Sequence, residues 1–285
     1  MNRKDGIKVK KIDGMHSLIP FIMPKRADAD VYINTKIDVT NLVNYITELK
    51  KDEKYQNLTY FHAFACAIGK VVYNRPLLNR FVINKTFYDR KDITLSYVAK
   101  KAFTDESEET FNVVKVENGD NIFTLSDKIS TQVKAVRKEK KTNAADDFIN
   151  NIGRLPKSIR WFMIKIVKFA DNHDLIPSSL TSNSIYHSTV LLSNLGSIKC
   201  DAIYHHLTDL GTNSILMTIG EIKDEPVVID GKVEVRKMCD FGVNLDERIA
   251  DGFYFAKALK LFEYVINNPK ELEEFANARI DTKQD

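Results

Sequence analysis

A short charged stretch near the carboxyl terminus holds the residues best suited to chemistry. It begins with Asp246-Glu247-Arg248 and ends with the pair Asp251-Gly252. A β-rich run precedes it and an apolar run with helical spacing follows it, so the charges lie where a strand turns into a helix. Carboxylates at such a junction can accept and return protons during a reaction. A solvated turn has the same composition, and the stretch alone does not decide between the two.

Three other polar residues could stabilise charge or move a proton. Ser193 lies in TVLLSNLGS, residues 189–197, which reads as a strand followed by a turn. A hydroxyl at such a turn can donate to an oxyanion. His205 and His206 come shortly after it, and imidazole titrates near neutral pH. The interpretation that we favour for these two is a hydrogen-bonded interior or surface histidine.

Familiar nucleotide and metal motifs are missing from the sequence. It contains no GxGxxG, GxxxxGK[ST], HExxH or GxSxG run, which disfavours dinucleotide, nucleoside triphosphate, zinc-protease and serine-hydrolase chemistry. The three cysteines, Cys66, Cys200 and Cys239, are far apart and form no C-x-x-C pair. We therefore expect no metal site and no disulfide framework, and we expect each cysteine to be a small buried hydrophobic residue.

The charged stretch resembles a known signature. The superfamily of chloramphenicol acetyltransferase and dihydrolipoamide acyltransferase, the catalytic core of 2-oxo acid dehydrogenase complexes, carries D-H-R-x-x-D-G. Residues 246–252, DERIADG, match every position except the histidine, which is Glu247 here. Residues 189–197, 75–81 (RPLLNRF) and 32–39 resemble family segments in the expected order. The resemblance runs from about residue 20 to 275, and it is greatest to stand-alone bacterial members.

This resemblance implies both a fold and an activity. The fold would be α+β and chloramphenicol acetyltransferase-like, a mixed sheet with flanking helices that forms trimers. The active site would be a tunnel between subunits that binds acyl-coenzyme A as a substrate, with no cofactor held permanently. The activity would be acyl transfer to a small thiol, alcohol or amine, or to a lipoyl group. The alternative is a catalytically inactive relative that binds coenzyme A or acts as a scaffold.

The resemblance also assigns roles to individual residues. Ser193 corresponds to the hydroxyl that stabilises the oxyanion, and Asp251 to the aspartate that holds the architecture of the site. Arg26 or Arg248 corresponds to the arginine partner of that aspartate. His205 or His206 could supply the base that the signature lacks.

Glu247 is the departure that matters most. A glutamate in water has a pKa near 4.3, whereas a general base works best with a pKa near the operating pH. Burial raises the pKa of a carboxyl group and could retune it. Three interpretations stay open: a retuned base, a group that binds a cationic or hydroxylated acceptor, or the mark of a lost activity.

The elements that must position these residues follow from hydrophobic spacing. Strands and helices are interleaved without regular alternation, which indicates a mixed sheet. Residues 229–232 suggest a hairpin, because Asp-Gly suits a tight turn. We predict helices after Thr40 and over 59–73, 125–141 and from about 251, and strands over 31–39, 80–83, 86–88, 93–100, 111–116, 188–192, 215–219 and 232–243.

Composition sets the remaining expectations. The 285 residues carry 42 Lys and Arg against 39 Asp and Glu, for a net charge of +3, and 44% are apolar. Such a mix argues against disorder and against a concentrated basic nucleic-acid surface. No signal peptide or membrane-spanning run is visible, and we expect a cytoplasmic protein. We also expect residues 1–285 to form a single catalytic-type domain, with no lipoyl domain and no peripheral-subunit-binding domain.

Residues 159–169, IRWFMIKIVKF, form a basic amphipathic segment. A helix of this kind can lie on a membrane surface. The interpretation that we favour is a helix buried against the domain or against a neighbouring subunit, because apolar helix faces are usually core.

Overall fold

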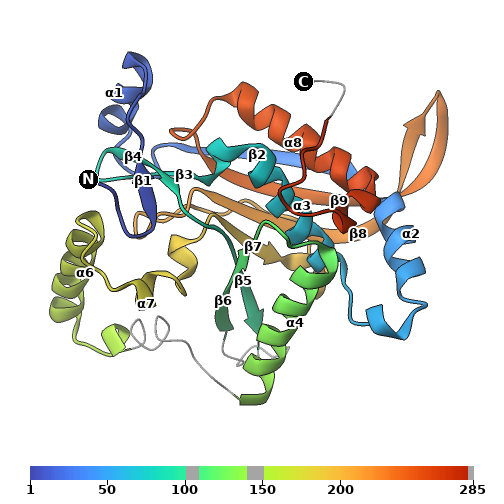
Figure 1. Cartoon of the computed structure of the whole chain (residues 1–285), viewed down its shortest axis with the longest axis horizontal. Coiled ribbons are helices and arrows are strands. Elements are labelled where there is room, and N and C mark those ends of the chain that lie inside the picture. The colour runs from blue at the N-terminus through green and yellow to red at the C-terminus, as the bar shows by residue number, and fades with distance from the viewer. Residues whose placement is uncertain (101–108, 140–150, 282–285) are drawn as a thin grey trace.

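The computed structural model describes residues 1–100, 109–139 and 151–281. Its centre is a six-stranded sheet with the order β2-β9-β8-β7-β5-β6. β7 runs parallel to both β5 and β8, and the other neighbours are antiparallel. The predicted mixed sheet with flanking helices is therefore confirmed (Figure 1).

The elements have the following bounds. The central strands are Asp30–Asp38 (β2), Ile93–Lys100 (β5), Glu109–Val116 (β6), Val190–Asn194 (β7), Ile215–Ile229 (β8) and Lys232–Asp246 (β9). A second sheet, in the order β1-β4-β3, comprises Gly6–Lys8 (β1), Arg80–Ile83 (β3) and Thr86–Arg90 (β4). The helices are Gly14–Ile22 (α1), Thr40–Leu49 (α2), Tyr60–Asn74 (α3), Ile122–Glu139 (α4), Lys157–Asn172 (α6), Ser178–Thr181 (α7) and Gly252–Asn267 (α8).

One face of the central sheet forms the core together with α2, α3, α4 and α8. Side chains alternate along a strand, so every second residue of β9 points at the helices. The ring of Phe241 in β9 lies edge-on to Phe64 of α3 and Phe262 of α8, with ring centroids 5.2 Å apart in each pair. This packing fixes the helix that follows the charged stretch against the strand that precedes it.

The start of α3 depends on an uncharged histidine. Thr59 caps the helix and His62 completes a capping box, with its Nδ1 accepting from the Thr59 backbone N–H at 3.1 Å. The ring is buried, and burial lowers the pKa of His62 to about 4, with the charge of Lys50 adding to the effect and that of Asp127 opposing it. Protonation would remove the acceptor from the capping box.

We predict that His62 makes stability depend on pH. The folded chain keeps the ring neutral while the unfolded chain protonates it below about pH 6.5. The free energy of unfolding should therefore fall by about 3 kcal/mol as the pH drops from about 6.5 to about 4. Urea unfolding at several pH values, with wild type and His62→Gln compared, isolates this contribution. Glutamine retains an acceptor without titrating, so equal pH slopes for the two proteins would contradict the prediction.

The β8–β9 hairpin contains the predicted Asp-Gly turn. Ile229 pairs with Lys232, and both Asp230 and Gly231 have positive φ, 48° and 79°, as a tight two-residue hairpin requires. β8 extends ten residues beyond its predicted end at Ile219. The added part projects from the sheet as a two-stranded ribbon (Figure 1). Both faces of such a ribbon tolerate charged residues, so its sequence lacks the alternation of apolar and polar residues that predicts a strand.

The structure overturns part of the interpretation of residues 159–169. They do form a helix, within α6, but Asp171 is its only buried residue. The helix lies at the edge of the described part of the chain, next to α7 and away from the core helices (Figure 1). Burial against the domain is therefore wrong for this helix.

Candidate functional site

Ser193 lies near the carboxyl end of β7, on the sheet face opposite the core helices. Its neighbours Val190 and Leu192 are buried in the core, so alternation directs the Ser193 side chain to the outer face. Ser193 pairs with Thr218 of β8, which in turn pairs with Gly242 of β9. The half-buried Ser193 hydroxyl makes no hydrogen bond to a described residue and is free to donate to a ligand.

The chain segment 200–207 crosses this outer face over β8, β9 and β2. Two glycines let it lie close to the sheet: a Cβ on Gly220 would meet the Ala202 nitrogen at 2.8 Å, and one on Gly242 would meet the Ile203 carbonyl oxygen at 2.4 Å. The Thr218 hydroxyl donates to that same Ile203 carbonyl. These contacts hold the segment that carries the two candidate histidines.

His205 and His206 are both exposed and lie away from Ser193. The His205 backbone exchanges hydrogen bonds with the buried Asn244 side chain of β9, so this histidine lies two strands from β7, or about 10 Å laterally. His206 Nδ1 lies 3.4 Å from the Tyr32 hydroxyl on β2, the far edge of the sheet. Neither imidazole reaches the Ser193 hydroxyl of the same chain.

The end of β9 is fixed by a buried ion pair. Arg248 Nε and Nη2 donate to the two carboxylate oxygens of Asp246, each at 2.7 Å, and both side chains are buried. Arg248 Nη1 also donates to the Met23 carbonyl oxygen at 3.0 Å. A two-pronged pair of this kind has a defined geometry as well as a favourable energy, so it orients the turn between β9 and α8.

Glu247 projects from this turn between its two buried neighbours. Its side chain is exposed, while its backbone N–H donates to the Ala29 carbonyl oxygen at 2.9 Å. Within a single chain the Glu247 carboxylate is therefore open to solvent.

Asp251 caps the helix that follows. Its carboxylate accepts from the Tyr254 backbone N–H at 2.8 Å, the usual role of an aspartate at a helix start.

Arg26 is not a partner of Asp251 in this structure. The guanidinium is buried, with Nη2 donating to the Val82 carbonyl oxygen at 3.0 Å and Nη1 to that of Thr208 at 3.1 Å. Burial lowers the pKa of Arg26, and the nearby charge of Asp246 opposes that shift. Arg248 binds Asp246 instead of Asp251. The expected arginine–aspartate contact is thus replaced by a helix cap and a separate ion pair.

Ser193 and Glu247 lie far apart along the sheet in one chain. Ser193 lies in the row of Gly242, and Glu247 follows five residues later along β9. At about 3.3 Å per residue this separation is about 16 Å along the strand direction. One chain therefore cannot bring these two side chains to the same reacting atom.

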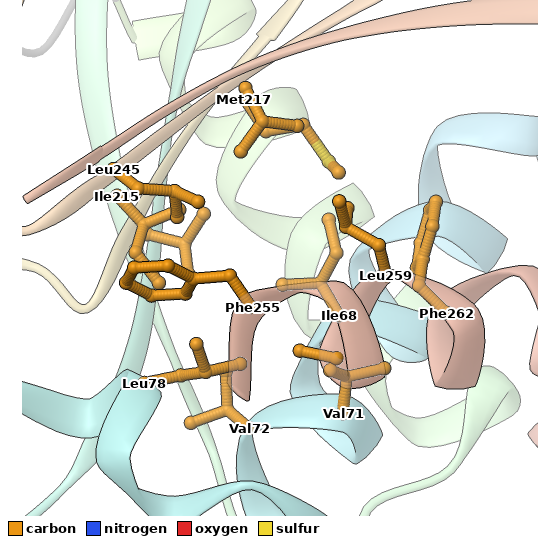
Figure 2. Close-up of a pocket in the computed structure, with 13 residues that line it drawn as sticks. Ile68, Val71, Val72, Leu78, Ile215, Met217, Leu245, Phe255, Leu259 and Phe262 are labelled. Atoms are coloured by element: carbon orange, nitrogen blue, oxygen red, sulfur yellow. The ribbon is translucent and has the colours of Figure 1, made fainter. Parts of the chain in front are cut away.

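An apolar cavity of about 50 Å³ lies on the other side of the sheet. Figure 2 shows its walls: Ile215, Met217 and Leu245 from the strands, facing side chains of α3 and α8. Because the Ser193 hydroxyl points to the opposite face, this cavity is a packing gap in the core and is separate from the candidate site.

Asp30 is a half-buried acid beside the 200–207 segment. It pairs with Asp246 across β2 and β9, and its Oδ2 accepts from the Leu207 backbone N–H at 3.2 Å. Its other oxygen is buried without a partner among the described residues, and burial raises the pKa of Asp30. No sequence motif marks this residue, since its role arises only where the 200–207 segment meets β2.

Other kinds of site are not formed by the described residues. Across 1–100, 109–139 and 151–281, no cluster of three or more histidine, cysteine, aspartate or glutamate side chains could hold a metal ion. In the same ranges no helix is both long and apolar enough to cross a membrane. Cys66 and Cys239 are buried as predicted, whereas Cys200 is exposed at the start of the crossing segment, so the prediction was wrong for this cysteine.

The sequence comparisons agree with the predicted resemblance. The family model described as 2-oxoacid dehydrogenases acyltransferase (catalytic domain) matches residues 172–273. The lipoamide acyltransferase component of the branched-chain alpha-keto acid dehydrogenase complex of Bacillus subtilis is 22% identical over 276 residues. That match covers 93% of this chain and 54% of the relative, so the chain spans about half of the length of this relative.

Solved structures share the fold across almost the whole chain. Dihydrolipoamide acetyltransferase of Azotobacter vinelandii has a TM-score of 0.62 at 13% identity, covering 93% of this chain and 94% of that one. A chloramphenicol acetyltransferase has a TM-score of 0.55 at 11% identity, with 92% and 98% covered. The predicted resemblance and the chloramphenicol acetyltransferase-like fold are confirmed.

Proposed function

We propose that this chain, whose residues 172–273 match the acyltransferase catalytic domain of 2-oxoacid dehydrogenases, transfers an acyl group from acyl-coenzyme A to a small acceptor. The acceptor is a thiol, alcohol or amine, or a lipoyl group. Coenzyme A enters as a substrate and is not retained between turnovers. The observation that carries the proposal is the Ser193 hydroxyl near the end of β7, at the signature position for oxyanion stabilisation, which makes no hydrogen bond to any residue that the structure describes.

Residue spacing supports the assignment of the roles. The Azotobacter vinelandii structure concerns the catalytic roles of a serine, a histidine and an asparagine, and the latter two are four positions apart. Glu247 and Asp251 have the same separation. The serine precedes that histidine by 52 positions, and Ser193 precedes Glu247 by 54. We assign Ser193, Glu247 and Asp251 to the corresponding places.

The site that we propose is completed by a second chain. Since Ser193 and Glu247 of one chain are about 16 Å apart along the sheet, the Ser193 of one subunit must face the Glu247 of its neighbour. A cyclic trimer repeats such a contact three times and closes on itself. The exposure of Glu247 in a single chain agrees with a side chain reserved for this contact.

The chemical step then needs few groups. The acceptor X–H attacks the thioester carbonyl carbon while the Glu247 carboxylate takes its proton. Ser193 donates a hydrogen bond to the oxyanion of the tetrahedral intermediate. When the intermediate collapses, the carbon–sulfur bond breaks, and the departing coenzyme A thiolate receives the proton. Glu247 comes from the neighbouring subunit. There the Asp246–Arg248 ion pair and the Asp251 helix cap fix the backbone on either side of it.

A second candidate function is a scaffold that binds coenzyme A without chemistry. The substitution of glutamate for histidine favours it, together with the absence of any described base within reach of Ser193 in one chain. In this case the trimer would form and bind acyl-coenzyme A, and no acyl group would move.

An acceptor panel separates the two candidates. Purified protein is incubated with acetyl-coenzyme A and, in turn, dihydrolipoamide, an alcohol and an amine, and the loss of thioester is followed by chromatography. The acyltransferase proposal predicts turnover with at least one acceptor. If acetyl-coenzyme A still binds but neither wild type nor Glu247→His transfers the acetyl group to any acceptor, the scaffold function is supported and the acyltransferase proposal is rejected.

A further inference from the structure

α6 carries a continuous stripe of exposed apolar side chains. Ile159, Phe162, Ile166 and Phe169 are all exposed, and their spacing of three, four and three residues places them on one face. Phe162 and Phe169 keep 59% and 60% of their surface accessible. Monomeric proteins rarely leave such a stripe bare, and an exposed one marks an interaction surface.

The polar side of the same helix is strongly basic. Residues 151–170 contain no aspartate or glutamate. Trp161 is also exposed, and the Lys165 ammonium lies 3.6 Å from the centre of its ring. The exposed cations in and just before the helix are Arg154, Lys157, Arg160, Lys165 and Lys168.

The helix is held to the rest of the chain at its carboxyl end. The buried Asp171 accepts from Arg3 Nη2 at 3.3 Å and from the Gly211 backbone N–H at 3.1 Å, and its Oδ1 lies 3.2 Å from His187 Nε2. Burial would raise the pKa of Asp171, but the His187 hydrogen bond and the charges of His187 and Arg3 keep it below its usual value. Asp171, the single acid of α6, is thus buried and paired, so the charged side chains on the exposed surface of α6 are all cations.

A second apolar helix lies at the same end of the molecule. α1 exposes Met15, Leu18, Phe21 and Ile22, again with helical spacing, and Figure 1 places it with α6 on the side where the amino terminus lies. The first eleven residues add five cations against one acid. Two helices with exposed apolar residues and a basic terminus thus lie on one side of the molecule, with α1 above and α6 below the amino terminus in Figure 1.

We propose that α6 binds the surface of a bilayer containing anionic lipids. An amphipathic helix with aromatic residues on one face and cations on the other lies in the plane of such a surface, with its apolar face among the acyl chains. The cations meet the lipid phosphates, and the aromatic rings suit the boundary between headgroups and hydrocarbon.

Charge selects this occupant over a second copy of the chain. A second copy of the chain would have to offer a surface that fits the stripe and also carries acids for these five cations, and the chain has a net charge of +3. An anionic bilayer complements every one of them and needs no matching shape. This binding is independent of the acyl transfer proposed above.

Vesicle co-sedimentation of the full chain tests the proposal. The probes are vesicles of phosphatidylcholine alone and of phosphatidylcholine mixed with phosphatidylglycerol. We expect binding to the mixed vesicles, weak binding to the neutral ones, and loss of binding at high salt. Phe162→Glu should weaken binding to the mixed vesicles by more than about tenfold. The double variant Lys165→Gln with Lys168→Gln should weaken it by about fivefold for each charge removed.

Matched controls make the test specific. Phe275→Glu changes a phenylalanine of nearly the same exposure, 60% against 59%, in the segment after α8. Lys260→Gln with Lys270→Gln removes two exposed cations elsewhere. Both controls should bind mixed vesicles as wild type does. Equal binding by wild type and Phe162→Glu, or none by wild type, would overturn the proposal. A lower oligomer mass for Phe162→Glu in light scattering, without vesicle binding by wild type, would assign the stripe to a second copy instead.

Discussion

Ser193→Ala is expected to lower kcat for acyl transfer by about a hundredfold to a thousandfold. Loss of one oxyanion donor typically costs about 2.7–4 kcal/mol of barrier. The hydroxyl makes no hydrogen bond within the described chain, so its removal leaves no protein group unpaired. KM should change little, because the hydrogen bond forms with the intermediate rather than with the bound thioester. Steady-state kinetics with the acceptor that supports turnover measures both constants.

The control for this variant lies four residues away. Ser197 is exposed, and its hydroxyl donates to the Asn194 carbonyl oxygen at 2.8 Å in the turn after β7. Ser197→Ala should retain nearly full kcat. If Ser193→Ala kept the wild-type kcat while its thermal unfolding was unchanged, Ser193 would not be the oxyanion donor.

Arg248→Met is expected to destabilise the fold by about 3–5 kcal/mol. The substitution leaves the Asp246 carboxylate buried without its counter-charge, and an unpaired buried charge is costly. It also removes the donor to the Met23 carbonyl oxygen. Urea unfolding followed by circular dichroism, at a fixed protein concentration, gives the change in the free energy of unfolding.

Two companion variants show whether the ion pair is responsible. Asp246→Leu combined with Arg248→Met removes both charges, and it should cost much less than the sum of the single changes. Arg279→Met breaks the pair with Asp281, whose side chains are 87% and 86% exposed, and should change stability little. Additive costs in the double variant would show that packing, and not the uncompensated charge, sets the effect.

The interior elements could be predicted from the sequence because their patterns are local. β3 and β5 have the predicted bounds, and the buried α3 begins and ends within one residue of its prediction. The Asp-Gly turn of the hairpin also follows from residue type alone. Each of these features depends on alternation, helical spacing or a residue that tolerates positive φ.

Features that depend on surroundings were predicted less well. α1 was missed, although the Asp13 side chain caps it by accepting from the His16 N–H at 3.1 Å; Pro20 within the run obscures the helical pattern. α6 was predicted as a helix, but its apolar stripe could not reveal whether protein covers it. An amphipathic pattern shows that a face is apolar and does not identify what lies against it.

For the candidate site, too, the sequence indicates which residues matter but not what their side chains contact. The resemblance identified Ser193, Glu247 and Asp251 as residues to examine, but the partner of each side chain depends on the fold. Arg26 binds backbone carbonyl groups instead of Asp251, and Asp251 caps α8. The separation of Ser193 from Glu247 emerges only from the register of β7, β8 and β9.

Mixed oligomers test most directly whether two chains share the site. Ser193→Ala and Glu247→Ala chains, each with its own affinity tag, are co-expressed, and tandem purification selects oligomers that contain both. In a mixed cyclic trimer with a shared site, an intact Ser193 faces an intact Glu247 at about one third of the subunit interfaces. We predict about a third of the wild-type turnover from the mixed trimers and little from either parent. Mixed trimers as inactive as both parents would contradict the shared site.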